Sequence, residues 1–303
     1  MSARLTIEQI RRVAQQSGAR DITKVETDIV LTYLLQLIHE KRITEHIAFK
    51  GGTMLRKMIF GPRGRYSIDL DFTLRSDFPD EEVMEMMLDA LSMPYHGIRF
   101  KIDDKDWDFT DNSFFANPAC SHAGNERGIK IKLQVSLREK PILPVKALPQ
   151  IDQEYVKLLP FKPASIPCLA QEEVVSEKVR AASQRSKIRD LHDLSEIPAR
   201  QFNRDLVRSL SVIKLWESDK ENLDYERFAT QIENGKDYDL NDLRNLLRKD
   251  QRPDLKDMIR RAKEGFRFLG QLTELERRIV QDQPRCLKEE IAALKADAIK
   301  RAW

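Results

Sequence analysis

The sequence predicts an α+β fold in which two N-terminal helices precede a mixed sheet, and a mainly helical region follows. Apolar residues recur at steps of three and four between residues 7 and 40, whereas strand signals are confined to residues 46–137. Prolines are dense between residues 141 and 167, where no helix interior would tolerate them. A helical pattern then continues almost to the end of the chain. We therefore expect two domains, residues 1–165 and 166–303.

The expected elements follow from these patterns in order. Residues 7–40 form two helices whose apolar face includes Ile22, Val25, Ile29, Tyr33, Leu37 and Ile38. Strands are expected at residues 46–50, 68–74, 98–102 and 129–137, with a short helix at 53–60 and a longer one from about Asp80. The helices expected after the proline-rich stretch are 170–184, 188–195, 203–217, 223–232, 239–248, 254–280 and 285–302.

The composition excludes several classes of protein. The formal charge of the 303 residues is only +3, so contact with nucleic acid must come from local clusters of basic residues. Three widely spaced cysteines argue against a disulfide framework. The N-terminus lacks the apolar core of a signal peptide, and the apolar run Ile29–Ile38 is too short to cross a bilayer. We expect a cytoplasmic protein with no membrane partner.

Two aspartates behind a glycine pair carry the chemical signal. Asp69 and Asp71 alternate with apolar residues along the expected strand 68–74, so they share one face. Adjacent carboxylates repel unless a cation lies between them, and a divalent metal with a phosphate ligand supplies one. Gly51 and Gly52 stand where a strand turns into a helix, which lets the backbone approach a phosphate, and Thr53 adds a hydroxyl. This order suits nucleotidyl transfer with two metals.

Two simpler explanations exist for the same residues. The glycine pair is also typical of a plain tight turn, and alternating aspartates occur on solvated or edge strands where charge deters pairing. The expected strand 129–137 carries Gln134 near its middle, and a neutral amide is a weak metal ligand and a poor base.

At this point the chain resembles the AbiEii/AbiGii nucleotidyltransferase toxins, which include the MenT-type enzymes of type IV toxin–antitoxin systems. The resemblance rests on F-K-G-G-T-x-L-R at residues 49–56 and R-x-S-x-D-x-D at residues 65–71. Two further motifs match at residues 177–181 and at R-D-L-x-D-L, residues 189–194. The resemblance implies a DNA-polymerase-β-like nucleotidyltransferase fold, an NTP substrate and Mg²⁺ or Mn²⁺. It implies transfer of NMP to an RNA acceptor, the tRNA 3′ end, which blocks translation, and an AbiEi-type antitoxin or antitoxin kinase as partner.

The resemblance also implies roles for individual residues. Asp69, Lys178 and Asp193 would be catalytic, and Asp69 and Asp71 would hold the metal. The nucleotide would be bound by Gly51, Gly52, Thr53, Arg56, Ser67 and Lys178. Related toxins are phosphorylated at the position of Ser67, which suggests a regulatory phosphorylation site here. A phosphate beside the metal carboxylates would oppose nucleotide binding.

The helical half leaves three questions open. Lys178 would suit the β- and γ-phosphates of a nucleotide, although spacing alone favours an ordinary solvated lysine. Arg185 and Arg189 share its face if one helix continues, and a break near Ser186 would separate them. The resemblance implies that Asp193 is the late catalytic acid, with a helix-start carboxylate as the alternative. Polymerase-like nucleotidyltransferases commonly take a third carboxylate from a later strand, where this chain has Gln134, so either Asp193 serves as the third acid or a second metal is held weakly. Asp190 is less suited to the catalytic role.

Two other groups have simpler alternatives. Arg260, Arg261, Lys263 and Arg267 could follow an RNA backbone with Phe266 and Phe268 stacking on bases, although core packing is favoured for both rings. Cys120 and His122 invite a zinc site but lack a second pair of ligands. Two other functions remain alternatives: nucleotidyl transfer to a protein or small-molecule hydroxyl, and a catalytically weak nucleotide-binding or interaction module.

Overall fold

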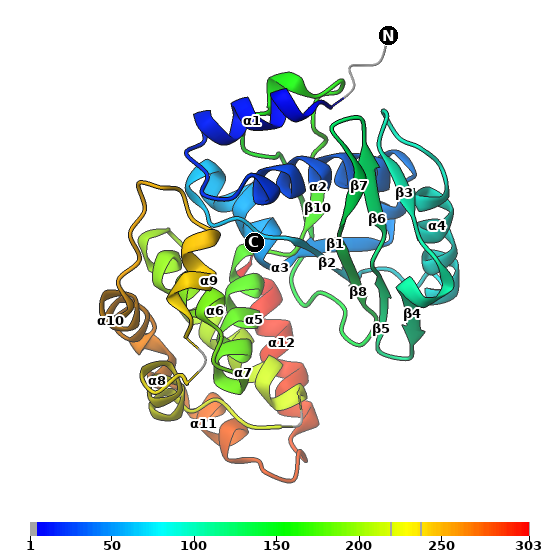
Figure 1. Ribbon diagram of the computed structural model, residues 1–303. Helices are drawn as coiled ribbons and strands as arrows, with labels where there is room; N and C mark the ends of the chain where they lie inside the picture. The colour runs from blue at the N-terminus through cyan, green and yellow to red at the C-terminus, as the bar shows by residue number, and fades with distance from the viewer. Residues whose placement is uncertain (1–4, 219, 237, 303) are drawn as a thin grey trace. The chain divides into compact units, whose positions relative to one another are not determined.

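The computed structural model describes residues 5–218, 220–236 and 238–302, and the chain forms two compact units (Figure 1). The sheet unit comprises Met1–Pro141, Val145–Leu169 and Arg244–Gln251. The helical unit comprises Ile142–Pro144, Ala170–Leu243 and Arg252–Trp303. The expected boundary after residue 165 lies four residues before the end of Val145–Leu169, and residues 244–251 return to the sheet unit. Each unit is described separately.

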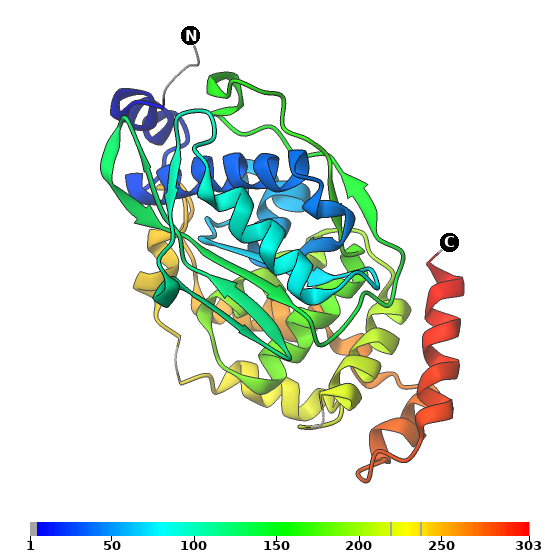
Figure 2. The same ribbon diagram turned by 90° about the vertical axis from the view of Figure 1, so that its right-hand side faces the viewer.

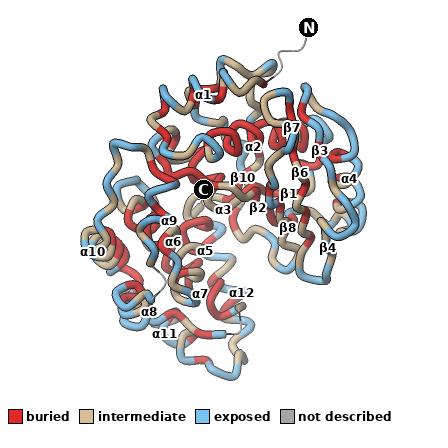
Figure 3. Tube along the Cα trace, in the orientation of Figure 1, coloured by how far each residue is buried: buried red, intermediate tan, exposed pale blue. Residues whose placement is uncertain are grey.

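The sheet unit begins with two helices, α1 (Ile7–Gln16) and α2 (Ile22–Glu40), as the sequence predicts. Thr6 and Gln9 form a capping box at the start of α1, which satisfies free backbone N–H groups there. Asp21 caps α2 by accepting a hydrogen bond from the Thr23 backbone at 2.8 Å. Almost all of α2 from Val25 to Ile38 is buried, and the tube in Figure 3 shows it as a core element.

A seven-stranded mixed sheet has the strand order β4-β5-β8-β2-β1-β10-β9, and a three-stranded sheet has the order β3-β6-β7. Strands β2 and β8 pair in parallel, as do β1 and β10. The strands are β1 (Ile47–Lys50), β2 (Asp69–Leu74), β3 (Arg99–Lys101), β4 (Trp107–Thr110), β5 (Ser113–Ala116), β6 (Ala119–His122), β7 (Asn125–Lys130), β8 (Lys132–Ser136), β9 (Lys146–Leu148) and β10 (Ile166–Cys168). The four expected strand regions are present, with 129–137 divided between β7 and β8; β4, β5, β6, β9 and β10 were not expected.

Helix α4 (Asp80–Ser92) and α2 lie side by side in the view of Figure 2, and α4 also contacts β3 of the smaller sheet. Leu70 and Phe72 of β2 are fully buried, so the alternation expected for this strand is confirmed. The short helix expected near 53–60 starts earlier, as α3 (Gly51–Met54), and continues as a π-helical segment, Leu55–Phe60. The predicted α+β class with a mixed sheet is confirmed.

The helical unit contains α5 (Gln171–Gln184), α6 (Ile188–Glu196), α7 (Arg204–Glu217), α8 (Tyr225–Glu233), α10 (Leu255–Gly265), α11 (Glu274–Gln281) and α12 (Lys288–Arg301), and α9 (Leu240–Asn245) begins in it. The single helix expected over 254–280 is wrong: a 3₁₀ turn, Arg267–Gly270, separates α10 from α11. The chain also breaks between α5 and α6, so Lys178 and Arg189 do not lie on one continuous helix. Among the described residues, no helix combines the length and apolar character that a bilayer crossing requires.

Candidate active site

The glycine turn and the D-x-D strand meet in the sheet unit. Gly51 has φ +80°, in the region that favours glycine. A Cβ atom at Gly51 would lie 2.3 Å from Asp71 Oδ2, a distance that no side chain can occupy. Strands β1 and β2 pair with Lys50 opposite Asp71, which brings the end of β1 beside this carboxylate. Only glycine therefore allows the turn and the Asp71 carboxylate to be this close.

Gly52 brings a second pair of polar groups to the same turn. A Cβ atom at Gly52 would lie 2.7 Å from Arg65 Nη2 and 3.1 Å from Ser67 Oγ. Arg65 and Ser67 are 5% and 6% exposed. Ser67 precedes β2, which begins at Asp69. Its hydroxyl still borders the glycine turn.

Thr53 and Arg56 are engaged by the protein itself. The Thr53 hydroxyl donates to the backbone carbonyl of Asp69 at 2.5 Å and is fully buried. The Arg56 guanidinium is 2% exposed and donates from Nε and Nη2 to Asp28 Oδ2, at 3.1 and 3.0 Å. It also donates to the Gly64 carbonyl and lies 3.9 Å from the centre of the Tyr66 ring. Both residues thus fasten the segment between α3 and β2.

A buried carboxylate on α2 anchors this arrangement. Asp28 is fully buried and also pairs with Lys57 Nζ at 2.9 Å. Burial by itself would raise the pKa of Asp28, but the charges of Arg56 and Lys57 and their hydrogen bonds lower it to about 2. Tyr155 adds a hydroxyl that accepts from Lys57 Nζ at 2.8 Å. The α2 helix thereby fixes the segment that carries Arg56.

The polar side of β2 continues onto its neighbour β8. Parallel pairing places Asp69 opposite Lys132 and Asp71 opposite Gln134, and all but the exposed Lys132 are half-buried. The neutral amide predicted at this position is therefore the cross-strand neighbour of Asp71. Lys132 and Arg65 were not singled out, although their spacing from Gln134 and from Ser67 could have identified them. Among the described residues, no three His, Cys, Asp or Glu side chains gather in a group that could hold a metal.

The second group of predicted residues lies in the helical unit. Lys178 Nζ contacts Asp190 Oδ1 at 3.0 Å and Asp193 Oδ2 at 2.8 Å. Asp190 Oδ2 also accepts from Arg185 Nε at 2.9 Å. Lys178 is 12% exposed in its side chain, so the alternative of an ordinary solvated lysine is wrong. Burial would raise the pKa of Asp190, but the charges of Lys178 and Arg185 lower it.

The predicted residues thus fall into two groups. The structure brings Gly51, Gly52, Thr53, Ser67, Asp69 and Asp71 together within the sheet unit, with Arg56 one layer behind them. Lys178 and Asp193 are in direct contact within the helical unit. Asp190 shares Lys178 with Asp193, a role that its lower rank in the sequence analysis did not anticipate.

The basic residues of α10 form ion pairs at the surface, whereas the aromatic residues after them are packed in the core. Arg260, Arg261 and Lys263 contact carboxylates: Asp257 at 2.5 Å, Glu196 at 2.8 Å and Glu233 at 2.6 Å, respectively. Phe266 is fully buried and Phe268 is 7% exposed. Core packing is therefore confirmed for both rings, and stacking of RNA bases on them is wrong.

The remaining candidate pair, Cys120 and His122, serves the packing of β6. The His122 ring contacts Glu26 Oε1 through Nε2 at 3.0 Å, and its Nδ1 accepts from the Gly124 backbone at 3.1 Å. Cys120 is fully buried. Both ring nitrogens of His122 are thus engaged within the sheet unit.

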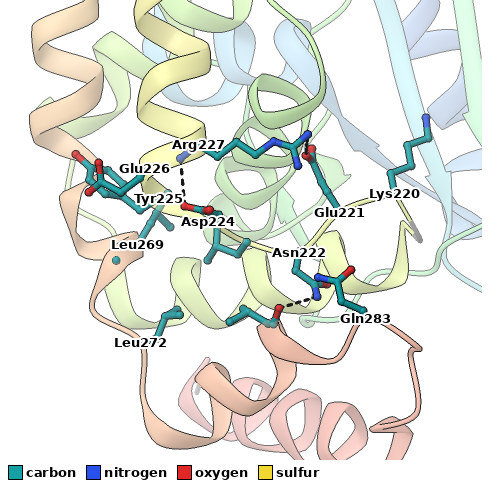
Figure 4. A pocket seen from close by; sticks show the side chains of 13 residues that line it. Lys220, Glu221, Asn222, Asp224, Tyr225, Glu226, Arg227, Leu269, Leu272 and Gln283 are labelled. Atoms are coloured by element: carbon teal, nitrogen blue, oxygen red, sulfur yellow. Dashed lines mark hydrogen bonds and ion pairs between the residues drawn. The ribbon is translucent and has the colours of Figure 1, made fainter.

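A hollow in the helical unit contains none of the predicted residues. It lies between residues 220–227 and the segments 269–272 and 280–283 (Figure 4). Arg227 points across it and pairs with Glu221 at 2.7 Å, while Asn222 lies near Gln283. The predicted chemistry therefore does not depend on this hollow.

The chain matches one protein-family model and is similar to several solved structures. A family model described as nucleotidyl transferase AbiEii toxin, type IV TA system, matches residues 33–281. Among solved structures, the chain is similar to MenT4, the nucleotidyltransferase toxin Rv2826c from Mycobacterium tuberculosis H37Rv, with a TM-score of 0.78 and 24% identity over 97% of this chain and 99% of that one.

A second match is weaker. JHP933 from Helicobacter pylori matches with a TM-score of 0.48 and 19% identity over 86% of this chain and 95% of its own. No curated protein sequence matches the chain. The likeness to MenT4 shows a shared fold, and the family model covers most of the chain.

Proposed function

This chain belongs to the AbiEii nucleotidyl transferase toxin family of type IV toxin–antitoxin systems, and we propose that it transfers NMP from an NTP to the 3′ end of tRNA. Such a transfer would block aminoacylation and hence translation. The observation that carries the proposal is the closeness of the Gly51 turn to the Asp71 carboxylate, at 2.3 Å from a Cβ that glycine lacks. This closeness leaves backbone, rather than a side chain, beside the carboxylate where a triphosphate would bind.

The donor set fits a hard divalent cation. Asp69 and Asp71 offer carboxylate oxygens from one strand face, and Mg²⁺ is commonly held by one or two carboxylates together with substrate phosphates. We propose that these two residues hold Mg²⁺ or Mn²⁺. When bound, the cation would offset the charge of the phosphates. Gly51, Gly52 and the nearby Ser67 and Arg65 would line the nucleotide, while Thr53 and Arg56 would position that lining from behind.

Lys178 and Asp193 supply the groups expected from the helical unit. The Lys178 ammonium would bind the β- and γ-phosphates and offset the charge of the leaving pyrophosphate. Asp193, at 2.8 Å from that ammonium, would accept the proton of the acceptor hydroxyl. Asp190 keeps Lys178 oriented through its own contact at 3.0 Å. In this scheme the ammonium and its two carboxylates act as one group.

Ser67 is the proposed point of regulation. Its hydroxyl lies 3.1 Å from the position of a Gly52 Cβ and beside Arg65. A phosphate attached there would fill the space proposed for the nucleotide and add negative charge near Asp69. An antitoxin kinase, or an AbiEi-type antitoxin, would act at this residue.

Gln134 keeps a rival function open. Its place opposite Asp71 puts an amide where a third carboxylate would strengthen the metal site. A weak metal site would suit a nucleotide-binding or interaction module. Transfer to a protein or a small-molecule hydroxyl is the rival with the same chemistry.

One assay separates these functions. Purified protein is incubated with Mg²⁺, each α-labelled NTP singly, total tRNA and a protein extract, in parallel with Asp69→Ala and Lys178→Ala. Label in the tRNA that disappears with Asp69→Ala supports the proposal. Label confined to protein bands, or no label with any NTP, refutes it. Growth of cells expressing the chain without an antitoxin should slow, and Lys178→Ala should relieve this.

A further inference from the structure

We propose that the surface around residues 244–251 binds the phosphate backbone of the RNA acceptor. This inference rests on the proposed function, because it names where the acceptor of that reaction is held. The residues, here called the return segment, belong to the sheet unit although Leu243 and Arg252 on either side belong to the helical unit. They carry a basic surface that the sequence analysis did not identify.

The return segment is held in place along its length. Arg248 forms an antiparallel bridge with Ala19, just after α1. Leu246 accepts a hydrogen bond from the Tyr66 backbone at 2.7 Å, and Gln251 donates to the Arg63 carbonyl at 2.9 Å. Its side chains at Leu246 and Leu247 are buried. The segment is therefore a fixed part of the sheet unit.

These contacts gather positive charge on one surface. Arg20, Arg63, Arg248 and Lys249 lie on or against the return segment. Arg248 pairs with Glu154 at 3.1 Å and with Asp250 at 3.6 Å, and Arg63 pairs with the same Asp250. These four basic residues outnumber the two carboxylates that they contact. Sequence reasoning could not find this surface, because its basic residues come from three separate stretches of the chain, at 20, 63 and 248–249.

The basic groups are ordered in a way that suits a phosphate ligand. Arg20 Nη2 donates to the backbone carbonyls of Lys249 and Gln251, at 2.9 and 3.3 Å. These neutral partners fix the guanidinium without cancelling its charge. Arg63 pairs with Asp250 at 3.6 Å, but the two side chains are 77% and 56% exposed, so the pair is weak and easily exchanged. Planar guanidinium groups of this kind match phosphate oxygens in pairs.

The surface is also connected to the glycine turn. The return segment bonds to Tyr66, which stands between Arg65 and Ser67, and both of these border Gly52. Arg63 begins the same stretch. A polynucleotide held by the return segment would therefore lie against the segment that lines the proposed nucleotide site. This position favours an RNA strand over an acidic protein surface as the occupant.

The test compares two pairs of charge reversals in the full chain. The double variant Arg63→Glu with Lys249→Glu changes the proposed surface. The control, Arg99→Glu with Lys101→Glu, changes two exposed residues of β3 in the three-stranded sheet and alters the net charge by the same amount. Binding of fluorescein-labelled total tRNA is measured by anisotropy from 50 to 300 mM salt. Transfer to tRNA is measured on the same proteins, with thermal unfolding as a check on folding.

We expect the first pair to weaken tRNA binding about tenfold or more and to reduce the salt dependence, by roughly one unit of slope per lost phosphate contact. The KM for tRNA should rise and the KM for the NTP should stay the same. The Arg99 and Lys101 pair should change tRNA binding less than threefold.

Two outcomes would overturn the inference. Equal losses of tRNA binding in the two pairs of variants would show that only the net charge of the chain matters. Unchanged tRNA binding in the Arg63 and Lys249 pair would exclude this surface. If the wild-type chain transfers nothing to tRNA, the proposed function fails instead. The anisotropy arm then still decides whether the surface binds RNA.

Discussion

Gly51→Ala tests the contact on which the proposed function depends. The substitution places a methyl group 2.3 Å from Asp71 Oδ2 and 3.0 Å from Asp71 Cβ and Cγ. Ordinary contact begins at 3.4 Å, so the carboxylate oxygen must retreat by about 1 Å. A displacement of about 1 Å at a reacting centre costs on the order of a hundredfold in rate. We therefore expect nucleotidyl transfer to fall about a hundredfold or more.

Gly18→Ala is the matched control. Gly18 also has a positive φ, +64°, but nothing lies within 4 Å of its added Cβ. Both substitutions incur the left-handed backbone cost of about 1–2 kcal/mol. Gly51→Ala adds steric overlap worth about 1–3 kcal/mol. In urea unfolding, the control should lose only the first amount. Because the Gly18 carbonyl accepts a hydrogen bond from the Lys249 backbone in the return segment, its transfer rate is compared at saturating tRNA, where it should stay within about twofold.

The assay is transfer of label from α-labelled NTP to tRNA, read together with the free energy of unfolding. Loss of transfer by Gly51→Ala in protein that remains folded at the assay temperature supports the proposed site. Wild-type transfer by Gly51→Ala would refute the reasoning, because the Asp71 carboxylate would then tolerate displacement. Equal loss in Gly18→Ala would show that backbone strain alone is responsible.

Three further changes probe the charged groups. Asp190→Asn should raise the KM for the NTP about tenfold, because Lys178 loses one of its two carboxylate partners. Arg185→Ala, which removes the other partner of Asp190, is the milder comparison. An unchanged KM in Asp190→Asn would contradict the orienting role of Asp190. The lowered pKa of Asp28 contributes about 2 kcal/mol of stability above pH 4, which is lost as pH falls from about 4 through about 2. Asp28→Asn should therefore lower the free energy of unfolding, measured in urea at pH 7, by roughly 3–5 kcal/mol. The difference in this free energy between wild type and Asp28→Asn should be smaller at pH 2.5. An equal difference at both pH values would exclude a contribution from the lowered pKa of Asp28. Gln134→Asp should lower the Mg²⁺ concentration for half-maximal transfer severalfold, since it adds a carboxylate opposite Asp71; unchanged metal dependence would argue that residue 134 lies away from the metal.

Local pattern was sufficient to predict the elements that position the site. Alternation of Asp69 and Asp71 with buried apolar residues identified β2, and the glycine pair identified the turn before it. Strands β9 and β10 were not predicted because they lie in the proline-rich stretch and β10 itself contains Pro167. Proline is poorly suited to the hydrogen-bond ladder of a sheet. These strands are therefore defined by the strands with which they pair, and local sequence does not show that pairing.

The roles of Arg56 and Asp190 could not be read from spacing. Arg56 stands in the motif and was expected at the nucleotide, but its partner Asp28 lies 28 positions earlier on α2. The family resemblance assigns the late catalytic acid to Asp193, so the sequence predicts a lesser role for Asp190. The structure shows both carboxylates on one ammonium, a relation that depends on how α5 and α6 pack. The roles of Arg56 and Asp190 depend on contacts between separate helices, and local sequence does not show those contacts.

Both units use a buried ion pair to hold a group that the proposed reaction needs. Asp28 fixes Arg56 behind the glycine turn, and Asp190 fixes Lys178 beside Asp193. Replacing a buried ion pair with apolar residues is often neutral or stabilising, so stability alone does not explain either pair. The orientation of Arg56 and Lys178 does explain the two pairs, because a nucleotide site requires its charged groups to be ordered before the substrate binds. Asp28→Asn and Asp190→Asn should accordingly differ in kind: the first should weaken folding more than nucleotide affinity, and the second should do the reverse.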